Sequence, residues 1–84
     1  MLVNNIEPCD YHFAVTKSDT TVYSPPIEVL FVGSAGDVAL ILAESDDAIV
    51  YQNVQNGQEI YRKIKKVMAT NTTAGDFVGS RRKR

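Results

Sequence analysis

One stretch of the chain decides its fold class: Ile27-Glu28-Val29-Leu30-Phe31-Val32-Gly33-Ser34-Ala35-Gly36-Asp37-Val38. Its first six residues are mostly β-branched or aromatic, which is typical of a strand. Glycine tolerates positive φ, so Gly33 and Gly36 predict a hairpin loop over residues 33–36. Residues 37–43 then form a return strand whose continuous apolar run indicates burial on both faces, against other strands or another subunit.

The same pattern of short strands and turns continues to the end of the chain. Residues 44–47 read Glu-Ser-Asp-Asp and predict an acidic turn. Residues 48–54 alternate as a half-exposed strand does. Asn56-Gly57 is a strong hairpin signal, so residues 59–70 are expected to return beside that strand. Residues 75–79 could add a last short strand. The sequence predicts an all-β domain, a small antiparallel β-sandwich or barrel of about six short strands.

A helix is the rival interpretation for residues 58–69, because Ile60, Ile64 and Val67 also have helical spacing. The Asn-Gly turn before this segment and the threonine-rich segment after it favour a strand. The alternation breaks after Ile64, and a β-bulge near Lys65-Lys66 would explain the break.

The chain divides into residues 1–13, an N-terminal arm or edge strand, residues 14–79, a single β-domain, and residues 80–84, a basic C-terminal tail. With 84 residues, one cysteine and one histidine, it has neither a disulfide nor a His/Cys metal site to strengthen a thin core. Assembly with other subunits is the remaining route to stability. No export signal is recognisable, the longest apolar run is too short to span a bilayer, and the lone cysteine fits a reducing cytoplasm.

The net charge of −1 hides an uneven distribution along the sequence. Residues 1–61 carry nine carboxylates and one cation, whereas residues 62–84 carry eight cations and one carboxylate. Either the fold mixes these charges in space, or the domain has an acidic and a basic side suited to head-to-tail docking. The candidate protein-interface residues are the cations Arg62, Lys63, Lys65, Lys66, Arg81, Arg82, Lys83 and Arg84.

Residues suited to catalysis or to a cofactor are scarce. Asp46 and Asp47 are adjacent in a turn and both face water, His12 has no catalytic partner, and Cys9 has no nearby base. The glycines lack the lysine and helix that a phosphate-binding loop needs. We therefore expect no enzymatic activity, no cofactor, no metal and no small-molecule substrate. Asn71-Thr72-Thr73 matches a glycosylation sequon only by accident.

Nucleic acid is the alternative partner. The cations after residue 61 could neutralise phosphates, and Tyr61 and Phe77 could stack on bases. The acidic remainder of the chain would repel the same polymer, so a protein partner is preferred.

Several short segments carry a family resemblance by their order and spacing. They are Val15-Thr16-Lys17-Ser18-Asp19-Thr20-Thr21, Phe31-Val32-Gly33, Ala35-Gly36-Asp37-Val38, Val54 followed by Gly57, and Ile64-Lys65-Lys66-Val67-Met68-Ala69-Thr70 with Thr72-Thr73-Ala74. Together they resemble the spike-base family of small virion proteins found in tailed-phage heads, prophages and gene-transfer-agent particles. The match covers about residues 14–79. Lys17 stands where that family usually has proline, and the two ends of the chain fall outside the pattern.

The resemblance implies a non-enzymatic structural protein of the virion, assembled in the bacterial host cytoplasm. It implies a head spike base or decoration (cement) protein whose partners are its own copies and a major capsid or spike/fibre protein, with no membrane. A tail or baseplate adaptor would share these features. We expect Gly33, Gly36 and Gly57 to hold turns. We expect burial against the core or a neighbour for Val29, Phe31, Val38, Leu40, Leu42, Val50, Ile64 and Val67.

Overall fold

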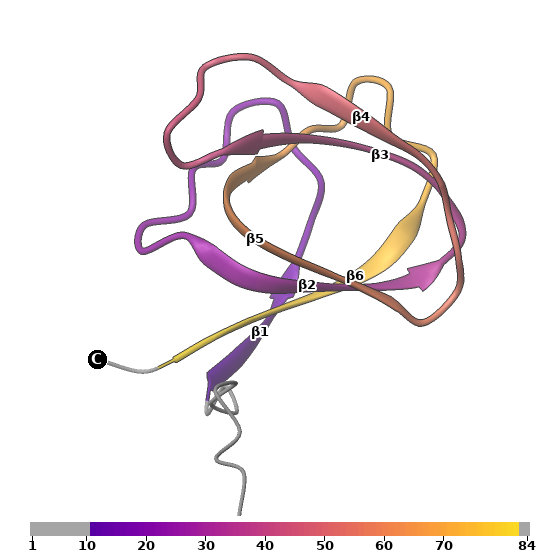
Figure 1. Cartoon of the computed structure of the whole chain (residues 1–84), viewed down its shortest axis with the longest axis horizontal. Helices are drawn as coiled ribbons and strands as arrows, with labels where there is room; N and C mark the ends of the chain where they lie inside the picture. Colours follow the sequence, from indigo (N-terminus) through magenta and orange to yellow (C-terminus); the bar gives the residue numbers. More distant parts are fainter. Residues whose placement is uncertain (1–10, 83–84) are drawn as a thin grey trace, which may run out of the picture.

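A computed structural model describes residues 11–82 of the chain, and within that range every regular element is a strand (Figure 1). The strands are β1 (Tyr11–Val15), β2 (Ile27–Ser34), β3 (Gly36–Leu42), β4 (Ile49–Val54), β5 (Gln58–Val67) and β6 (Gly75–Arg81). They form one antiparallel sheet in the order β1-β6-β2-β5-β3-β4. The predicted all-β, antiparallel class is confirmed. None of the described residues belongs to a helix that could cross a membrane.

The sheet curls over its own inner face, so that β3 and β4 lie opposite β2 and β6 in Figure 1. β5 makes this possible because it is the longest strand and changes partners along its length. Its first part pairs with β2 and its last part with β3. The enclosed core consists mainly of aliphatic side chains, of which the largest fully buried ones are Ile27, Leu30, Val32, Val38, Leu40, Ile64 and Val67.

The phase of β2 differs from the sequence prediction. The pairing of β2 with β5 shifts register between Ile27 and Val29, and this irregularity points Leu30 and Val32 into the core. Phe31 therefore faces outward and is 37% exposed, so it does not join the core. Val50 on the edge strand β4 is also exposed and outside the core. Burial of these two side chains against a neighbour stays a prediction. Four of the other predicted positions are buried: Val38, Leu40, Ile64 and Val67. The remaining two, Val29 and Leu42, are half-buried.

β3 is covered on both faces, as its continuous apolar run predicts. Val38 and Leu40 belong to the core, while Ala39 and Ile41 on the opposite face are 1% and 7% exposed. The segment between β5 and β6 runs along this strand, since Met68 N donates to Ala39 O at 2.9 Å. The chain's own connection thus lies beside β3, without a second subunit.

The predicted hairpin over residues 33–36 is wrong. β2 and β3 follow each other in sequence, but β5 separates them in the sheet. Gly33 lies within β2, where a Cβ would meet the Cβ and carbonyl oxygen of Asp76 at 2.7 Å. Close packing, and not a turn, requires glycine at this position.

Asn56-Gly57 forms a turn but does not join paired strands. β4 lies beside β3, and β5 lies on the other side of β3. Gly57 has φ of +78°, while Asn56 is absent from the positive-φ residues. A two-residue type I′ hairpin needs positive φ at both positions, so this turn cannot be one. The amide oxygen of Asn56 instead accepts from Ala35 N at 2.6 Å, between β2 and β3.

The strand interpretation of residues 59–70 is confirmed as far as Val67, where β5 ends three residues earlier than predicted, and the predicted bulge is confirmed. Ile41 pairs with Lys66 and Leu42 pairs with Ile64, which leaves Lys65 as an extra residue in β5. This insertion restores Ile64 and Val67 to the same inner face despite their odd spacing.

The sheet also extends into the segments assigned to the arm and the tail. β1 begins at Tyr11 and β6 continues to Arg81. β1 and β4 are the two edge strands of the sheet.

Candidate functional site

The first group of resemblance residues forms a clasp between two loops. Asp19 Oδ1 accepts from the backbone nitrogens of Ala69 and Thr70, both at 2.9 Å. Asp19 Oδ2 accepts from Thr70 Oγ1 at 2.6 Å. The Thr70 hydroxyl is the largest cause of a lowered pKa at Asp19, with smaller contributions from the two backbone bonds and the Lys66 charge. The clasp holds the β1–β2 loop against the end of β5.

A second group meets around Asp37, on β3. Asp37 O accepts from Thr73 N at 2.8 Å and from Ala74 N at 3.1 Å, while Asp37 N donates to Thr73 Oγ1 at 2.9 Å. Its carboxylate accepts from Asn53 N at 3.1 Å, at a β4 residue with φ of +60°. Asp37 therefore joins β4 to the segment that leads into β6. These short resemblance segments hold the fold together, and the structure assigns them no chemistry.

The predicted basic residues of β5 lie among carboxylates. Lys65 Nζ is 3.3 Å from Asp46 Oδ1, although the Asp46 side chain is almost fully exposed. Lys63 lines a hollow of about 190 Å³ together with Glu28 and Glu44. Lys66 lies near Asp19 and lowers its pKa. At these places the fold mixes the two charged parts of the chain, as one of the two sequence interpretations expects.

The C-terminal cations are divided in the same way. Arg82 N donates to Glu28 Oε1 at 3.0 Å, and its Nε lies 3.5 Å from the same oxygen. Arg81 places its guanidinium carbon 4.7 Å from the ring centroid of Tyr11. Lys83 and Arg84 lie outside the described residues. Arg62 Nη1 donates to the carbonyl of Tyr61 at 2.9 Å. An interface role for these cations stays a prediction.

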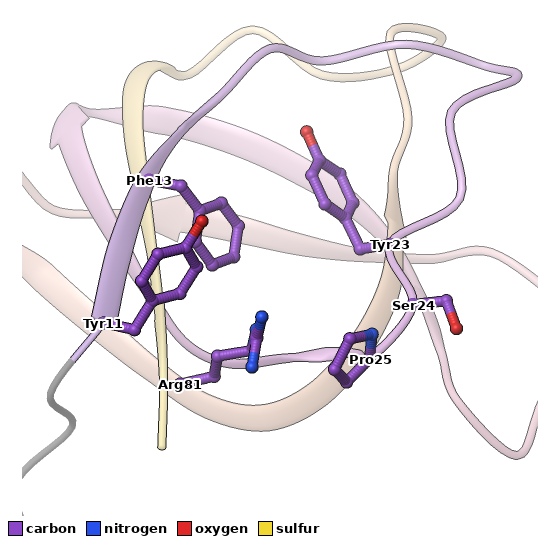
Figure 2. A pocket seen from close by; sticks show the side chains of 6 residues that line it. All are labelled: Tyr11, Phe13, Tyr23, Ser24, Pro25 and Arg81. Atoms are coloured by element: carbon purple, nitrogen blue, oxygen red, sulfur yellow. The ribbon is translucent and has the colours of Figure 1, made fainter. Parts of the chain in front are cut away.

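An aromatic hollow lies where β1, the end of β6 and the segment before β2 meet (Figure 2). The Phe13 ring lies 5.5 Å from that of Tyr11 and 5.9 Å from that of Tyr23, centroid to centroid. Pro25 closes the side opposite β1, and the Arg81 guanidinium reaches in from below. The space measures about 160 Å³. Sequence reasoning missed this site because Tyr11, Phe13 and Tyr23 lie in segments taken as an arm and a loop.

The residues considered for chemistry are not brought together. His12 is an exposed residue of β1, and Asp46 and Asp47 are exposed in the β3–β4 loop. Cys9 lies outside the described residues. Thr72 of the sequon-like triplet is 6% exposed and accepts from Ala39 N, so it serves the fold. No group of three or more potential metal ligands occurs within residues 11–82.

No family model matches this chain, and no curated protein matches its sequence. A chain from a capsid structure is similar. The two share 28% sequence identity and a TM-score of 0.78, over 94% of this chain and 90% of the other. That structure is the capsid of a native gene-transfer-agent (GTA) particle, computed with C5 symmetry. The likeness supports a structural protein of a phage or gene-transfer-agent virion, and the spike-base family itself stays a prediction.

Proposed function

We propose that this protein is a non-enzymatic structural component of a tailed-phage-like particle. It attaches to the capsid surface as a head spike base or decoration (cement) protein and assembles there as a symmetric oligomer. One observation carries the proposal: a chain of the GTA capsid structure matches nearly the whole length of this one, at 28% identity and a TM-score of 0.78.

The outer face of the sheet supports attachment to another protein. Val29 of β2 pairs with Tyr61 of β5, and Phe31 pairs with Val78 of β6. Directly paired residues lie on the same face of a sheet, so these four side chains form one apolar patch. Tyr61 is 56% exposed and Phe31 37%. Grouped apolar exposure of this kind marks an interaction surface more often than scattered single residues do.

Basic side chains of β5 support a charged contact with the same neighbouring protein. Arg62 and Lys63 are exposed next to Tyr61. Lys65 is engaged with Asp46, and Arg82 with Glu28, within the subunit. We therefore assign the contact with an acidic neighbouring surface chiefly to Arg62 and Lys63. Lys66, Arg81, Lys83 and Arg84 stay candidate residues of the same contact.

Locating the protein in purified particles tests the proposal. Particles would be separated on a density gradient, analysed by mass spectrometry and labelled with antibody for electron microscopy. We expect the protein in the particle fraction, with label on the head. Label on the tail would support the adaptor alternative instead, and absence from particles would overturn the proposal.

A charge-reversal pair tests the contact with the neighbour. Arg62→Glu with Lys63→Glu should weaken particle association, and the loss should diminish at high salt because exposed charges are screened. Lys65→Glu is the matched control, since this lysine faces Asp46 of its own subunit. Equal retention of all variants on particles would remove these residues from the interface.

A further inference from the structure

The aromatic hollow combines apolar walls with a cation that has no carboxylate partner among the residues the structure describes. Tyr11, Phe13, Tyr23 and Pro25 form the walls, and Arg81 lies among them. Within residues 11–82, the guanidinium of Arg81 has the ring contact with Tyr11 but no ion pair with Asp or Glu. A cavity of about 150 Å³ can hold a molecule the size of benzene. The hollow of about 160 Å³ therefore suits one apolar side chain accompanied by an anion.

The opposite edge of the sheet carries an exposed apolar side chain close in sequence to a carboxylate. Ile49, the first residue of β4, is 62% exposed, the highest value among the exposed large hydrophobic residues. Asp47 precedes it by two residues in the β3–β4 loop and is exposed. Among the described residues, the Asp47 carboxylate makes no hydrogen bond or ion pair, since the bonds of this residue with Ser45 involve its backbone. An exposed apolar side chain and a carboxylate without a hydrogen-bond or ion-pair partner among residues 11–82 are thus two residues apart at the start of β4.

We propose that the hollow receives Ile49 and Asp47 of a second copy of this chain. Ile49 enters between the aromatic rings, and the Asp47 carboxylate meets the Arg81 guanidinium. The inference rests on the proposed assembly into a symmetric oligomer and names its contact. The charge complementarity of Asp47 and Arg81 favours a second copy, because neither side chain forms an ion pair within residues 11–82 of its own subunit.

The position of the two features in the sheet fits such a contact. The hollow lies at edge strand β1 and Ile49 at edge strand β4, the two ends of the strand order. A side chain and a hollow at different places on one surface make a head-to-tail contact, which closes into a ring when the rotation between copies allows. The contact also covers part of two sheet edges that would otherwise stay open to other chains.

Charge reversal tests the pairing in the full-length protein. The molar mass of wild type, Asp47→Arg, Arg81→Glu and the double variant would be followed by light scattering over a range of concentrations. We expect each single reversal to raise the apparent dissociation constant at least about tenfold, as for close interfacial charge pairs. The double variant should recover at least part of the loss. Glu44→Arg is the matched control, because it changes the same charge in the same loop without reaching the hollow.

Disulfide trapping tests the geometry without altering the charges. Ser24→Cys at the rim of the hollow and Ala48→Cys beside Ile49 would be made separately in a Cys9→Ser background. Both positions are exposed, so neither change should disturb folding. Mixing the two variants under mild oxidation should give a disulfide between position 24 of one copy and position 48 of another. Neither variant alone should cross-link.

The outcomes separate this inference from the proposed function. An assembled wild type that shows neither the cross-link nor any response to the reversals would overturn the inference and leave assembly intact. A wild type that stays monomeric at every concentration would also overturn it. Particle location, measured independently, would then decide the proposed function. If Arg81→Glu failed to fold, the dissociation constant of Asp47→Arg and the disulfide cross-link would still test the contact.

Discussion

Asp19 and Thr70 stand 51 residues apart in the chain and share a side-chain hydrogen bond of 2.6 Å. Two backbone nitrogens, those of Ala69 and Thr70, donate to the same carboxylate. These bonds favour the ionised carboxylate and hold its pKa below the usual range, despite its position at the surface. The Ser-Asp pair of the resemblance therefore acts as a link between two distant loops.

The stability of this protein should depend on Asp19 in acid. A carboxyl whose pKa is lower in the folded than in the unfolded state stabilises the fold above the unfolded pKa. That stabilisation disappears as pH falls through the folded value. We expect urea unfolding to show a loss of stability below about pH 4, the ordinary range of Asp. Asp19→Asn should lower stability at pH 7 and flatten the acid dependence. Glu44→Gln, at an exposed carboxylate that makes no hydrogen bond or ion pair among residues 11–82, should change neither. An unchanged acid profile in Asp19→Asn would contradict the assignment.

Thr72 should be needed for its hydroxyl. Its Oγ1 accepts from Ala39 N at 2.9 Å, and Ala39 and Thr72 are 1% and 6% exposed. Thr72→Val keeps the shape but leaves the Ala39 N–H buried without an acceptor, at a cost of about 1–3 kcal/mol. Denaturant titration would measure the change. Thr72→Ser keeps the hydroxyl and should lose less; equal losses would show that the hydrogen bond does not matter.

Gly36 should not tolerate a side chain. Its φ is +152°, and a Cβ there would lie 2.7 Å from both Ala74 N and Thr73 Oγ1. Gly36→Ala should therefore destabilise the protein by more than about 1 kcal/mol. Gly75→Ala is the control, because a Cβ at Gly75 meets nothing within 4 Å and its φ is not positive. Comparable thermal melting of the two variants would refute the proposed close approach of β3 to the β5–β6 segment.

Leu30 and Phe31 are neighbours in β2 with opposite roles. Leu30 is fully buried, whereas Phe31 is 37% exposed on the outer face. Leu30→Ala should cost about 2–5 kcal/mol through lost burial and the cavity left behind. Phe31→Ala should cost clearly less in the isolated domain, but it should weaken association with the particle. The reverse order of stabilities would place β2 in the opposite phase.

The fold class and several local features were predictable from the amino-acid sequence. β-branched runs and turn residues predicted the strands of an all-β domain, because side-chain crowding and glycine freedom act over a few residues. The break in alternation after Ile64, where Val67 and not Lys66 is the next apolar residue, predicted a bulge near Lys65-Lys66. The continuous run in β3 predicted burial on both faces. All of these depend on residues close together in the chain, where periodicity records which side chains face inward.

Strand pairing and the contacts between side chains of distant segments could not be read from the sequence and became visible in the folded chain. Gly33 and Asn56-Gly57 are residues typical of hairpin turns, yet neither joins two paired strands. β5 separates β2 from β3 in the sheet, and β3 separates β4 from β5. The phase of β2 depends on a register shift against β5 that leaves no mark in its own residues. Charge mixing and the aromatic hollow likewise arise from contacts between segments far apart in sequence. Strand order and register minimise the free energy of the whole sheet, so no local pattern contains them.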